Sequence, residues 1–237
     1  MWATIFLCRF MADPNEECFI SGVKLISCLY HTRKDRIRYT MTGWGIPTAI
    51  RESGLAEHFL RNFGMYATPD ASWKLRQDTE LNMTYGGWYI FMFGAGIDWG
   101  TRLIRVICHS SAEAEIAAGC FAGKRVRYIR ELFLELMHLK VIDGLAGETI
   151  FLIDNSACGP LSRNVGVAKA TEHYLRWQHF LRWLVVNKHA LVIWMSTDDM
   201  TGDIMTKLCL PGTYLKHKRT GLNQATDSKV PPKKGDK

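Results

Sequence analysis

Five acidic residues lie where regular elements of the chain are expected to begin or end: Asp70, Glu113, Glu115, Asp154 and Asp203. Hard divalent cations such as Mg²⁺ take oxygen ligands, and carboxylates are the usual source of them in proteins. Two such ions held about 3.5–4 Å apart activate water and stabilise the leaving oxygen during phosphodiester cleavage. Because carboxylates that converge on one point repel one another, a bound metal is the natural explanation of such a cluster. The acidic residues therefore predict metal-assisted hydrolysis, provided that the fold brings them together.

Each acidic residue taken alone also has a simpler structural interpretation. Asp154 and Asp203 are suitable N-caps for helices, and Asp70 follows a proline and suits a turn. Glu113 completes a capping box, in which an oxygen-bearing cap is followed three residues later by Glu. Glu113 and Glu115 are two residues apart on the expected helix, so about 200° of rotation separates them and one at most faces a given site. Spacing along the sequence leaves convergence of the acidic residues open.

The elements that must position these side chains are predicted from hydrophobic periodicity and turn signals. Strands are expected at 66–73, 87–93, 97–108, 149–153 and 191–195, and helices at 110–139, 169–188 and 202–208. The turn Gly94-Ala95-Gly96 is expected to join the second and third strands as a hairpin. Antiparallel strands come first and helix-separated strands follow, which is typical of a layered α/β fold with a mixed sheet.

The flanking segments differ from this central region of 65–215 in composition. Residues 1–40 are predicted to be helical, with Asp13 as an N-cap before Pro14 and a short strand at 37–39. An apolar stripe at helical spacing comprises Phe19, Val23, Ile26, Leu29 and Tyr30. The glycine-rich residues 41–64 are interpreted as a linker or insertion. The basic tail 216–237 is expected to be disordered.

Composition excludes several classes of protein. Hydrophobic residues make up 47% of the 237 residues and charged residues 22%, which is ordinary for a globular protein. The net charge of +7 favours a polyanionic partner, either nucleic acid or an anionic membrane surface. The seven cysteines are odd in number and lack Cys-x-x-Cys spacing, so we expect a reduced, intracellular protein without a zinc ribbon. Since no apolar run reaches about 18 residues, no membrane span is expected. A membrane is not among the expected partners.

Other polar and aromatic residues have two interpretations each. His173 lies on the apolar stripe of its helix and is either a packed histidine or a substrate contact, whereas His179 is expected to be exposed. Basic helix residues that could contact phosphates are Arg125, Arg127, Arg130, Arg176, Arg182 and Lys188, although charged helix faces are more often simply solvated. Trp177, Trp183 and Trp194 are expected in the core rather than as platforms for stacked bases.

Ser110-Ser111-Ala112-Glu113-Ala114-Glu115 resembles the Ser-Ser-x-Glu-Ala-Glu stretch of copia-type (Pseudoviridae) retrotransposon Pol polyproteins. Further stretches resemble the same family in order and spacing: Asp70-Ala71-Ser72-Trp73, Ile97-Asp98-Trp99, Asp154-Asn155-Ser156-Ala157, Glu172-His173, His179-Phe180-Leu181-Arg182 and Gly202-Asp203-Ile204-Met205-Thr206-Lys207. Arg9-Phe10-Met11-Ala12-Asp13-Pro14 resembles the segment that closes the reverse transcriptase part of such polyproteins. Ordered motifs cover about nine-tenths of the chain.

The resemblance implies a ribonuclease H domain at 65–215, with a mixed five-stranded sheet flanked by helices, preceded by a helical remnant of the reverse transcriptase connection at 1–40. Such a domain hydrolyses the RNA strand of RNA–DNA hybrids with two Mg²⁺ or Mn²⁺ ions. The catalytic and metal-binding residues that it implies are Asp70, Glu115, Asp154 and Asp203, and His173 is a candidate substrate contact. Glu115 is the ligand by this resemblance, which leaves Glu113 to the cap.

The resemblance also implies partners and a location. The expected partners are an RNA–DNA hybrid and the reverse transcriptase or integrase parts of the same polyprotein, in a cytoplasmic virus-like particle or in the nucleus. Two departures from the family pattern stand beside the first acidic residue. Ser72 replaces an acid, and Pro69 lies in an expected strand, where an edge position would tolerate it and a central one would not. The alternative function is a catalytically decayed or domesticated nucleic-acid-binding module.

Overall fold

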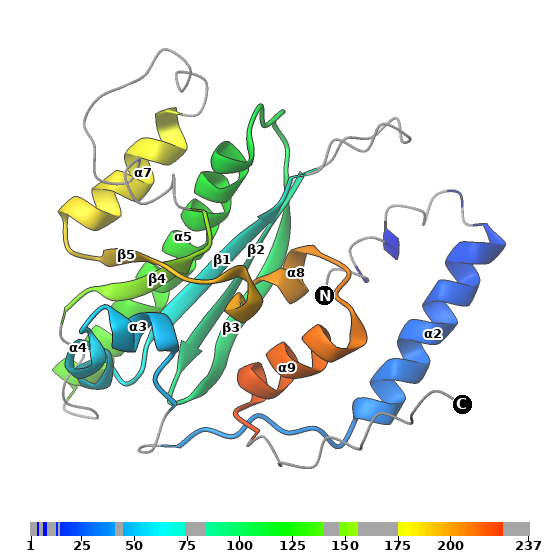
Figure 1. Cartoon of the computed structure of the whole chain (residues 1–237), viewed down its shortest axis with the longest axis horizontal. Helices are drawn as coiled ribbons and strands as arrows, with labels where there is room; N and C mark the ends of the chain where they lie inside the picture. Colours follow the sequence, from blue (N-terminus) through cyan, green and yellow to red (C-terminus); the bar gives the residue numbers. More distant parts are fainter. Residues whose placement is uncertain are drawn as a thin grey trace.

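The structure is a computed structural model that describes residues 15–40, 45–73, 84–139, 147–155 and 175–224, together with Thr4, Leu7, Cys8 and Asp13. A five-stranded sheet forms the centre of the molecule (Figure 1). Its strands are β1 (Tyr66–Ser72), β2 (Thr84–Met92), β3 (Ala95–Ile104), β4 (Thr149–Ile153) and β5 (Ala190–Trp194). The helices are α2 (Glu16–Thr32), α3 (Thr48–Glu52), α4 (Ala56–Arg61), α5 (Ser111–His138), α7 (Leu175–Val186), α8 (Asp203–Thr206) and α9 (Pro211–Leu222).

The strands follow the order β3-β2-β1-β4-β5 across the sheet. Strands β1, β2 and β3 pair antiparallel, whereas β4 pairs parallel with both β1 and β5. The parallel pairs need crossover connections, and the long helix α5 lies in the connection between β3 and β4. The mixed five-stranded sheet flanked by helices, expected for a ribonuclease H-like fold, is confirmed.

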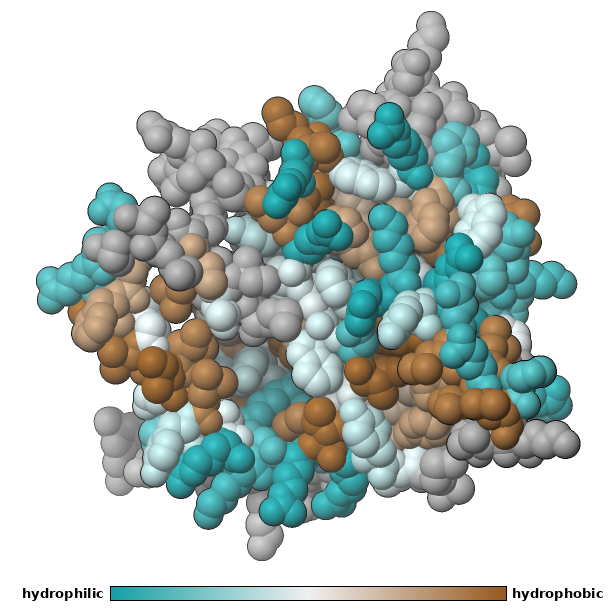
Figure 2. Space-filling model, turned by 180° about the vertical axis from the view of Figure 1, so that it is seen from behind, coloured by the Kyte–Doolittle hydropathy of each residue, from teal (hydrophilic) through white to brown (hydrophobic). Residues whose placement is uncertain are grey.

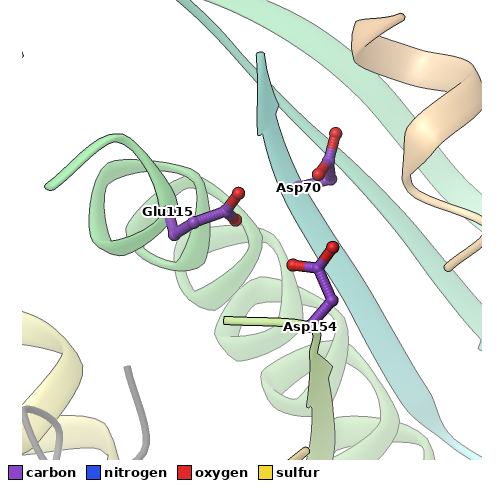
Figure 3. Close-up of side chains that lie close together, drawn as sticks. All are labelled: Asp70, Glu115 and Asp154. Atoms are coloured by element: carbon purple, nitrogen blue, oxygen red, sulfur yellow. The ribbon is translucent and has the colours of Figure 1, made fainter. Parts of the chain in front are cut away.

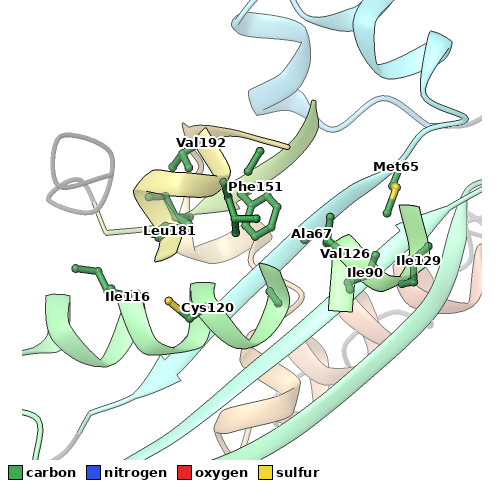
Figure 4. Close-up of a cluster of buried hydrophobic side chains, with 14 of the residues drawn as sticks. Met65, Ala67, Ile90, Ile116, Cys120, Val126, Ile129, Phe151, Leu181 and Val192 are labelled. Carbon is green, nitrogen blue, oxygen red and sulfur yellow. The ribbon is translucent and has the colours of Figure 1, made fainter. Parts of the chain in front are cut away.

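Separate hydrophobic clusters cover the two faces of the sheet. Successive strand residues point to opposite faces, so Ala67 and Phe151 pack with Ile116 of α5 and Leu181 of α7 (Figure 4). On the other face, the neighbouring strand residues pack against α3, α4 and α8; this second cluster includes Ile50, Phe59, Tyr66, Phe91, Leu152 and Met205. Both faces of the sheet are therefore buried, which fixes the register of the strands.

The hairpin between β2 and β3 turns earlier than predicted. Phe93 and Gly94 have φ values of 55° and 80°, and positive φ at both central residues is what a two-residue type I′ turn requires. Ala95 and Gly96, expected in the turn, belong to β3 instead. The predicted boundaries were wrong by a few residues elsewhere too, since β2 begins at Thr84 and β3 ends at Ile104.

Residues 48–61 are not the irregular linker that their glycine content predicted. They form α3 and α4, and these helices bury Ile50 and Phe59 at 0% and 1% exposure. The Phe59 ring lies 6.0 Å from that of Tyr66 in β1. Both side chains are part of the core on this face of the sheet, so contacts with strands later in the chain override the weak local signal. Residues 41–44 lie outside the described residues.

The basic tail was predicted to be disordered from Lys216 onward, and for residues 216–222 that prediction is wrong. Helix α9 continues through them to Leu222 and buries His217 at 1% exposure. The predicted boundary at 215 thus falls inside a helix. Residues 225–237 lie outside the described residues.

The N-terminal helix is confirmed, but its cap and its surroundings differ from the prediction. Asn15, not Asp13, caps α2, because its side-chain oxygen accepts a hydrogen bond from the Cys18 backbone N–H at 2.8 Å. The predicted apolar stripe faces solvent, with Phe19 72% and Ile26 68% exposed. Apolar residues correspondingly gather at the left of Figure 2, the side on which α2 lies in that view. Among the described helices, none combines the length and apolarity needed to cross a membrane.

The segment that follows α2 has no regular secondary structure at 35–40, so the short strand predicted at 37–39 does not form. The Arg38 backbone N–H donates to the Leu222 carbonyl at 3.0 Å. The Tyr39 hydroxyl donates to the Gly96 carbonyl at 2.8 Å. These contacts tie the segment to the end of α9 and to the β2–β3 hairpin instead of extending the sheet.

Candidate metal centre

Three of the predicted acidic residues meet at one end of the sheet. Asp70 lies in β1, Glu115 near the start of α5, and Asp154 directly after β4. Each carboxylate offers one oxygen that lies within 4.8 Å of the other two (Figure 3). Side chains from three separate elements therefore point toward a common volume that suits a cation.

The paths of β1 and β4 create this volume. Their parallel ladder pairs Tyr66 with Ile150 and Ala67 with Phe151, and among the described residues it extends no further. Pro69 lies beyond the last of these pairs. A proline was expected only in an edge strand, and the end of the ladder explains how the central strand β1 accommodates it. Strand β1 is central in the sheet, but its described ladder with β4 ends at Ala67, so Pro69 lies where no β1–β4 pair is present. Asp70 and Asp154 lie where the two strands have separated.

Asp70 is the most deeply buried member of the site, at 0% exposure. The Thr206 hydroxyl donates a hydrogen bond to its Oδ2, and the Lys207 ammonium lies 3.1 Å from its Oδ1. Burial raises the pKa of the Asp70 carboxyl above its ordinary value, Lys207 opposes this shift, and Asp203 adds to it. Asp70 is thus held between the acidic cluster on one side and the α8 segment on the other.

Gly202 allows that close approach of α8 to β1. A Cβ atom at this position would lie 2.4 Å from the Thr68 carbonyl oxygen and 3.1 Å from the Asp70 Cβ. The first contact is with backbone and cannot relax by rotation of a side chain. The glycine therefore places Asp203 and Lys207 next to Asp70.

Glu115 and Glu113 have the separate roles that their rotation about the helix axis permits. The Ala71 backbone N–H donates to Glu115 Oε1 at 3.3 Å, which ties α5 to the end of β1. Burial raises the pKa of Glu115 well above its ordinary value, and the Asp70 and Asp154 carboxylates add to this shift. Glu113 instead completes the predicted cap: its N–H donates to Ser110 Oγ at 3.2 Å, and its Oε2 accepts from the His109 N–H at 2.7 Å.

Asp154 is oriented by residues at the end of β5 and just after it. The Thr197 hydroxyl donates to its Oδ2 at 3.0 Å, and the Trp194 indole N–H donates to its backbone oxygen at 3.0 Å. Trp194 is 58% exposed, so the prediction that it lies in the core was wrong. Trp183 is also exposed, at 39%, whereas Trp177 packs against the core as predicted. The exposed indole of Trp194 lies beside the candidate metal centre.

Asp203 lies near Asp70 but does not belong to the cluster that the described acidic residues form. It begins α8, and its Oδ1 is 2.8 Å from Lys207 Nζ. Lys207 therefore bridges Asp203 and Asp70. Burial lowers the pKa of Lys207, but the two carboxylates outweigh burial and raise it above its ordinary value. Sequence reasoning did not single out Lys207, although its spacing of four residues from Asp203 was a signal.

The remaining candidate residues contribute less. His173 lies outside the described residues, and His179 is exposed as predicted. Three of the candidate phosphate contacts have partners within the protein: Arg125 with Asp98 at 2.9 Å, Arg127 with Glu131 at 2.8 Å, and Arg130 with Thr149 at 3.3 Å. The Arg125 and Arg127 side chains nevertheless stay 46% and 48% exposed.

Comparison with known proteins shows a partial similarity to a retrotransposon polyprotein. The chain is 28% identical over 122 residues to the retrovirus-related Pol polyprotein from transposon TNT 1-94 of Nicotiana tabacum. That alignment covers 51% of this chain and 9% of the polyprotein, so the chain corresponds to a small part of that protein. No protein-family model matches the chain.

Solved structures with a partial likeness to this one include ribonucleases H. Ribonuclease H1 from Halobacterium salinarum NRC-1 has a TM-score of 0.44 and 10% identity, and the match covers 60% of this chain and 92% of that one. The protease–reverse transcriptase of prototype foamy virus has a TM-score of 0.36 and 13% identity, covering 68% and 20% of the two chains. Both TM-scores are below 0.5, so the likeness to these structures is limited. By sequence, the chain is similar to a small part of a retrotransposon Pol polyprotein.

Proposed function

We propose that this chain is a metal-dependent nuclease that hydrolyses the RNA strand of RNA–DNA hybrids. The observation that carries the proposal is the convergence of Asp70, Glu115 and Asp154 from three elements onto one volume. Burial, together with the neighbouring Asp70 and Asp154 carboxylates, raises the pKa of Glu115, so ionisation of all three groups is costly. A divalent cation removes the cost, because it offsets the negative charge that the carboxylates share.

The donor set suits Mg²⁺ or Mn²⁺. All three donors are carboxylate oxygens, which these ions prefer over the nitrogen and sulfur ligands of zinc and copper sites. Asp70, Glu115 and Asp154 would hold one ion, and Asp70 with Asp203 would hold the second ion of the two that the family resemblance implies. Bound ions of this kind activate water and stabilise the departing oxygen of a phosphodiester.

The residues around the acidic cluster have a positioning role in this proposal. The Ala71 N–H fixes Glu115, and the Thr197 hydroxyl fixes Asp154, so each carboxylate keeps its orientation without a substrate. Such outer contacts commonly tune ligand geometry and affinity. The net charge of +7 favours a polyanionic substrate, and selection of RNA would use contacts to 2′-hydroxyl groups.

The wider context is part of the same proposal. The relative is a retrotransposon polyprotein, which supports the expected copia-type origin and a reverse transcriptase or integrase partner. A cytoplasmic virus-like particle or the nucleus would then be the place of action. His173 stays a candidate substrate contact.

The test is cleavage of an RNA–DNA hybrid labelled on its RNA strand, first in Mg²⁺ and then in Mn²⁺. We expect metal-dependent cutting of RNA by the unaltered chain and none by Asp154→Asn. Asp199→Asn is the matched control, because Asp199 also follows a strand of the sheet, β5, but pairs with Lys216 at 2.7 Å instead of joining the cluster. If Asp154→Asn cut the hybrid as fast as the unaltered protein, the proposed site would be wrong.

The second candidate is a nucleic-acid-binding module without catalysis, which the net charge of +7 favours. Such a module would bind the hybrid with a steep dependence on salt and with no need for metal. Folded protein that binds but fails to cut in both metals would support this alternative over the nuclease.

A further inference from the structure

Lys207 brings a positive charge to the edge of the acidic cluster. Its Nζ lies 3.1 Å from Asp70 Oδ1 and 2.8 Å from Asp203 Oδ1. The ammonium is partly accessible, with 36% of the side chain exposed, whereas the Asp70 and Asp203 side chains are 0% and 12% exposed. A single cation thus bridges two carboxylates, from β1 and α8, that are themselves largely shielded from solvent.

These two carboxylates are the protein ligands that a second divalent ion would use. Such an ion would need an oxygen of Asp70 together with an oxygen of Asp203, and Lys207 contacts one oxygen of each. The other Asp70 oxygen, Oδ2, accepts the Thr206 hydroxyl. The ammonium contacts both carboxylates, in the place that this second ion would take, so the two occupants exclude one another there.

The fold holds Lys207 in this position. Lys207 immediately follows α8, and its backbone N–H donates to the Asp203 carbonyl at 2.9 Å. Gly202 allows α8 to pack directly on the backbone of β1. The backbone of Lys207 is therefore held beside β1, where its flexible side chain reaches both carboxylates.

We propose that Lys207 is a built-in cation that takes the place of a second divalent ion while nucleic acid is absent. The nucleic-acid-free protein then binds one divalent ion, at Asp70, Glu115 and Asp154. The inference deepens the proposed function, because it rests on that metal centre. Two-ion catalysis stays compatible with it, provided that Lys207 leaves Asp70 and Asp203 when the substrate binds.

The experiment counts bound Mn²⁺ on the full chain without nucleic acid, by electron paramagnetic resonance of free Mn²⁺ and by calorimetry. We expect one ion for the unaltered protein and two for Lys207→Gln, with the second site at least about tenfold tighter than in the unaltered protein, since a charge repulsion of over 1.4 kcal/mol is removed. Lys207→Arg keeps the positive charge and should bind one ion.

Lys216→Gln is the matched control. It removes the same charge from a lysine that also pairs with an aspartate, Asp199 at 2.7 Å, but away from the acidic cluster. One bound ion is expected for this variant. Circular dichroism and thermal unfolding of each variant establish that it is folded.

Asp203→Asn tests the inference if Lys207→Gln fails to fold. It leaves Lys207 paired with Asp70, so we expect one ion with an affinity within about threefold of the original, because Asp203 is not a ligand of that ion. Loss of the ion in Asp203→Asn, or equal counts in Lys207→Gln and the unaltered protein, would overturn the inference. Failure of hybrid cleavage would instead count against the proposed function and leave these ion counts intact.

Discussion

The Thr197 hydroxyl donates a hydrogen bond of 3.0 Å to Oδ2 of Asp154, across 43 residues of sequence. The contact joins the turn after β5 to the residue that directly follows β4. The hydroxyl donates to one of the two carboxylate oxygens and thereby fixes the position of that oxygen. The orientation of this candidate metal ligand is therefore set by the segment that follows a neighbouring strand.

Thr197→Val should weaken binding of the divalent ion. Valine has nearly the same shape but lacks the donor, and loss of such outer contacts typically reduces metal affinity by about 10- to 100-fold. Calorimetric titration with Mn²⁺ measures the effect. Thr220→Val is the control, since the Thr220 hydroxyl donates to the Lys216 carbonyl within α9. Unchanged affinity in Thr197→Val would show that this hydrogen bond does not position Asp154.

Gly202→Ala should destabilise the protein and disturb the site together. The new Cβ would lie 2.4 Å from the Thr68 carbonyl oxygen, which forces α8 away from β1. Overpacking of this kind costs about 1–3 kcal/mol of the unfolding free energy. Urea denaturation measures the loss, and Mn²⁺ titration measures the disturbance.

Gly212→Ala provides the comparison for that substitution. A Cβ at Gly212 would meet nothing within 4 Å, and the residue lies in the first turn of α9. This variant should keep or slightly raise the unfolding free energy, by up to about 1 kcal/mol. If both glycine variants lost the same stability, the clash with Thr68 would not be the cause.

Glu113 and Glu115 should separate stability from metal binding. Glu113→Ala removes an N-cap interaction of α5 and should lower the unfolding free energy by about 1 kcal/mol, with little change in Mn²⁺ affinity. Glu115→Gln should abolish tight Mn²⁺ binding while the protein stays folded, because one charged ligand is lost. Urea denaturation and calorimetry on both variants provide the test. Loss of Mn²⁺ binding in Glu113→Ala with binding kept in Glu115→Gln would show that Glu113 is the ligand and Glu115 is not.

The metal-free protein should lose stability as the pH rises from acidic to neutral. Burial and two neighbouring carboxylates raise the pKa of Glu115 well above its ordinary value of 4.5 in the folded state. Between the unfolded and folded pKa values the folded chain binds more protons, so the unfolding free energy falls with increasing pH. The raised pKa of Asp70 acts in the same direction.

Thermal unfolding in EDTA across this pH range measures that dependence. Glu115→Gln removes one titrating group, so the decline should be smaller in the variant than in the unaltered protein. Saturating Mg²⁺ should reverse the trend, because the ion binds the deprotonated carboxylates and stabilises the folded state more at higher pH. A steeper decline in the variant would contradict the assigned burial of Glu115.

Local sequence patterns were sufficient for most of the secondary structure. The capping residues at 110–113 are close together in the chain, so the start of α5 could be predicted from the sequence. The hydrogen bond from the Glu113 N–H to Ser110 Oγ confirms the cap. Strand β4 was predicted from a short apolar run, because burial on both sides of a sheet leaves that pattern, and β1 was predicted from a strand–turn–strand pattern. The candidate ligands could also be named from the sequence, as acidic residues at the ends of these elements.

Contacts between distant segments decided what the sequence could not. Burial of Ile50 and Phe59 depends on strands that follow them, so a glycine-rich stretch that predicted a linker became part of the core. The exposure of the apolar stripe on α2 likewise depends on which segments pack against it. The helical spacing of the apolar residues is the same whether that face is buried or exposed.

The candidate site shows the same division. Sequence alone determined which residue types were available: acidic residues at the ends of strands and at the start of a helix. Only the tertiary structure decided that β1 lies beside β4. This pairing brings Asp70 and Asp154 together, although 84 positions separate them in the sequence. It also placed Lys207 beside Asp70, across 137 residues, where its charge occupies the space between two carboxylates. The physical reason is that charge and burial act through space, and the order of residues along the chain does not fix those distances.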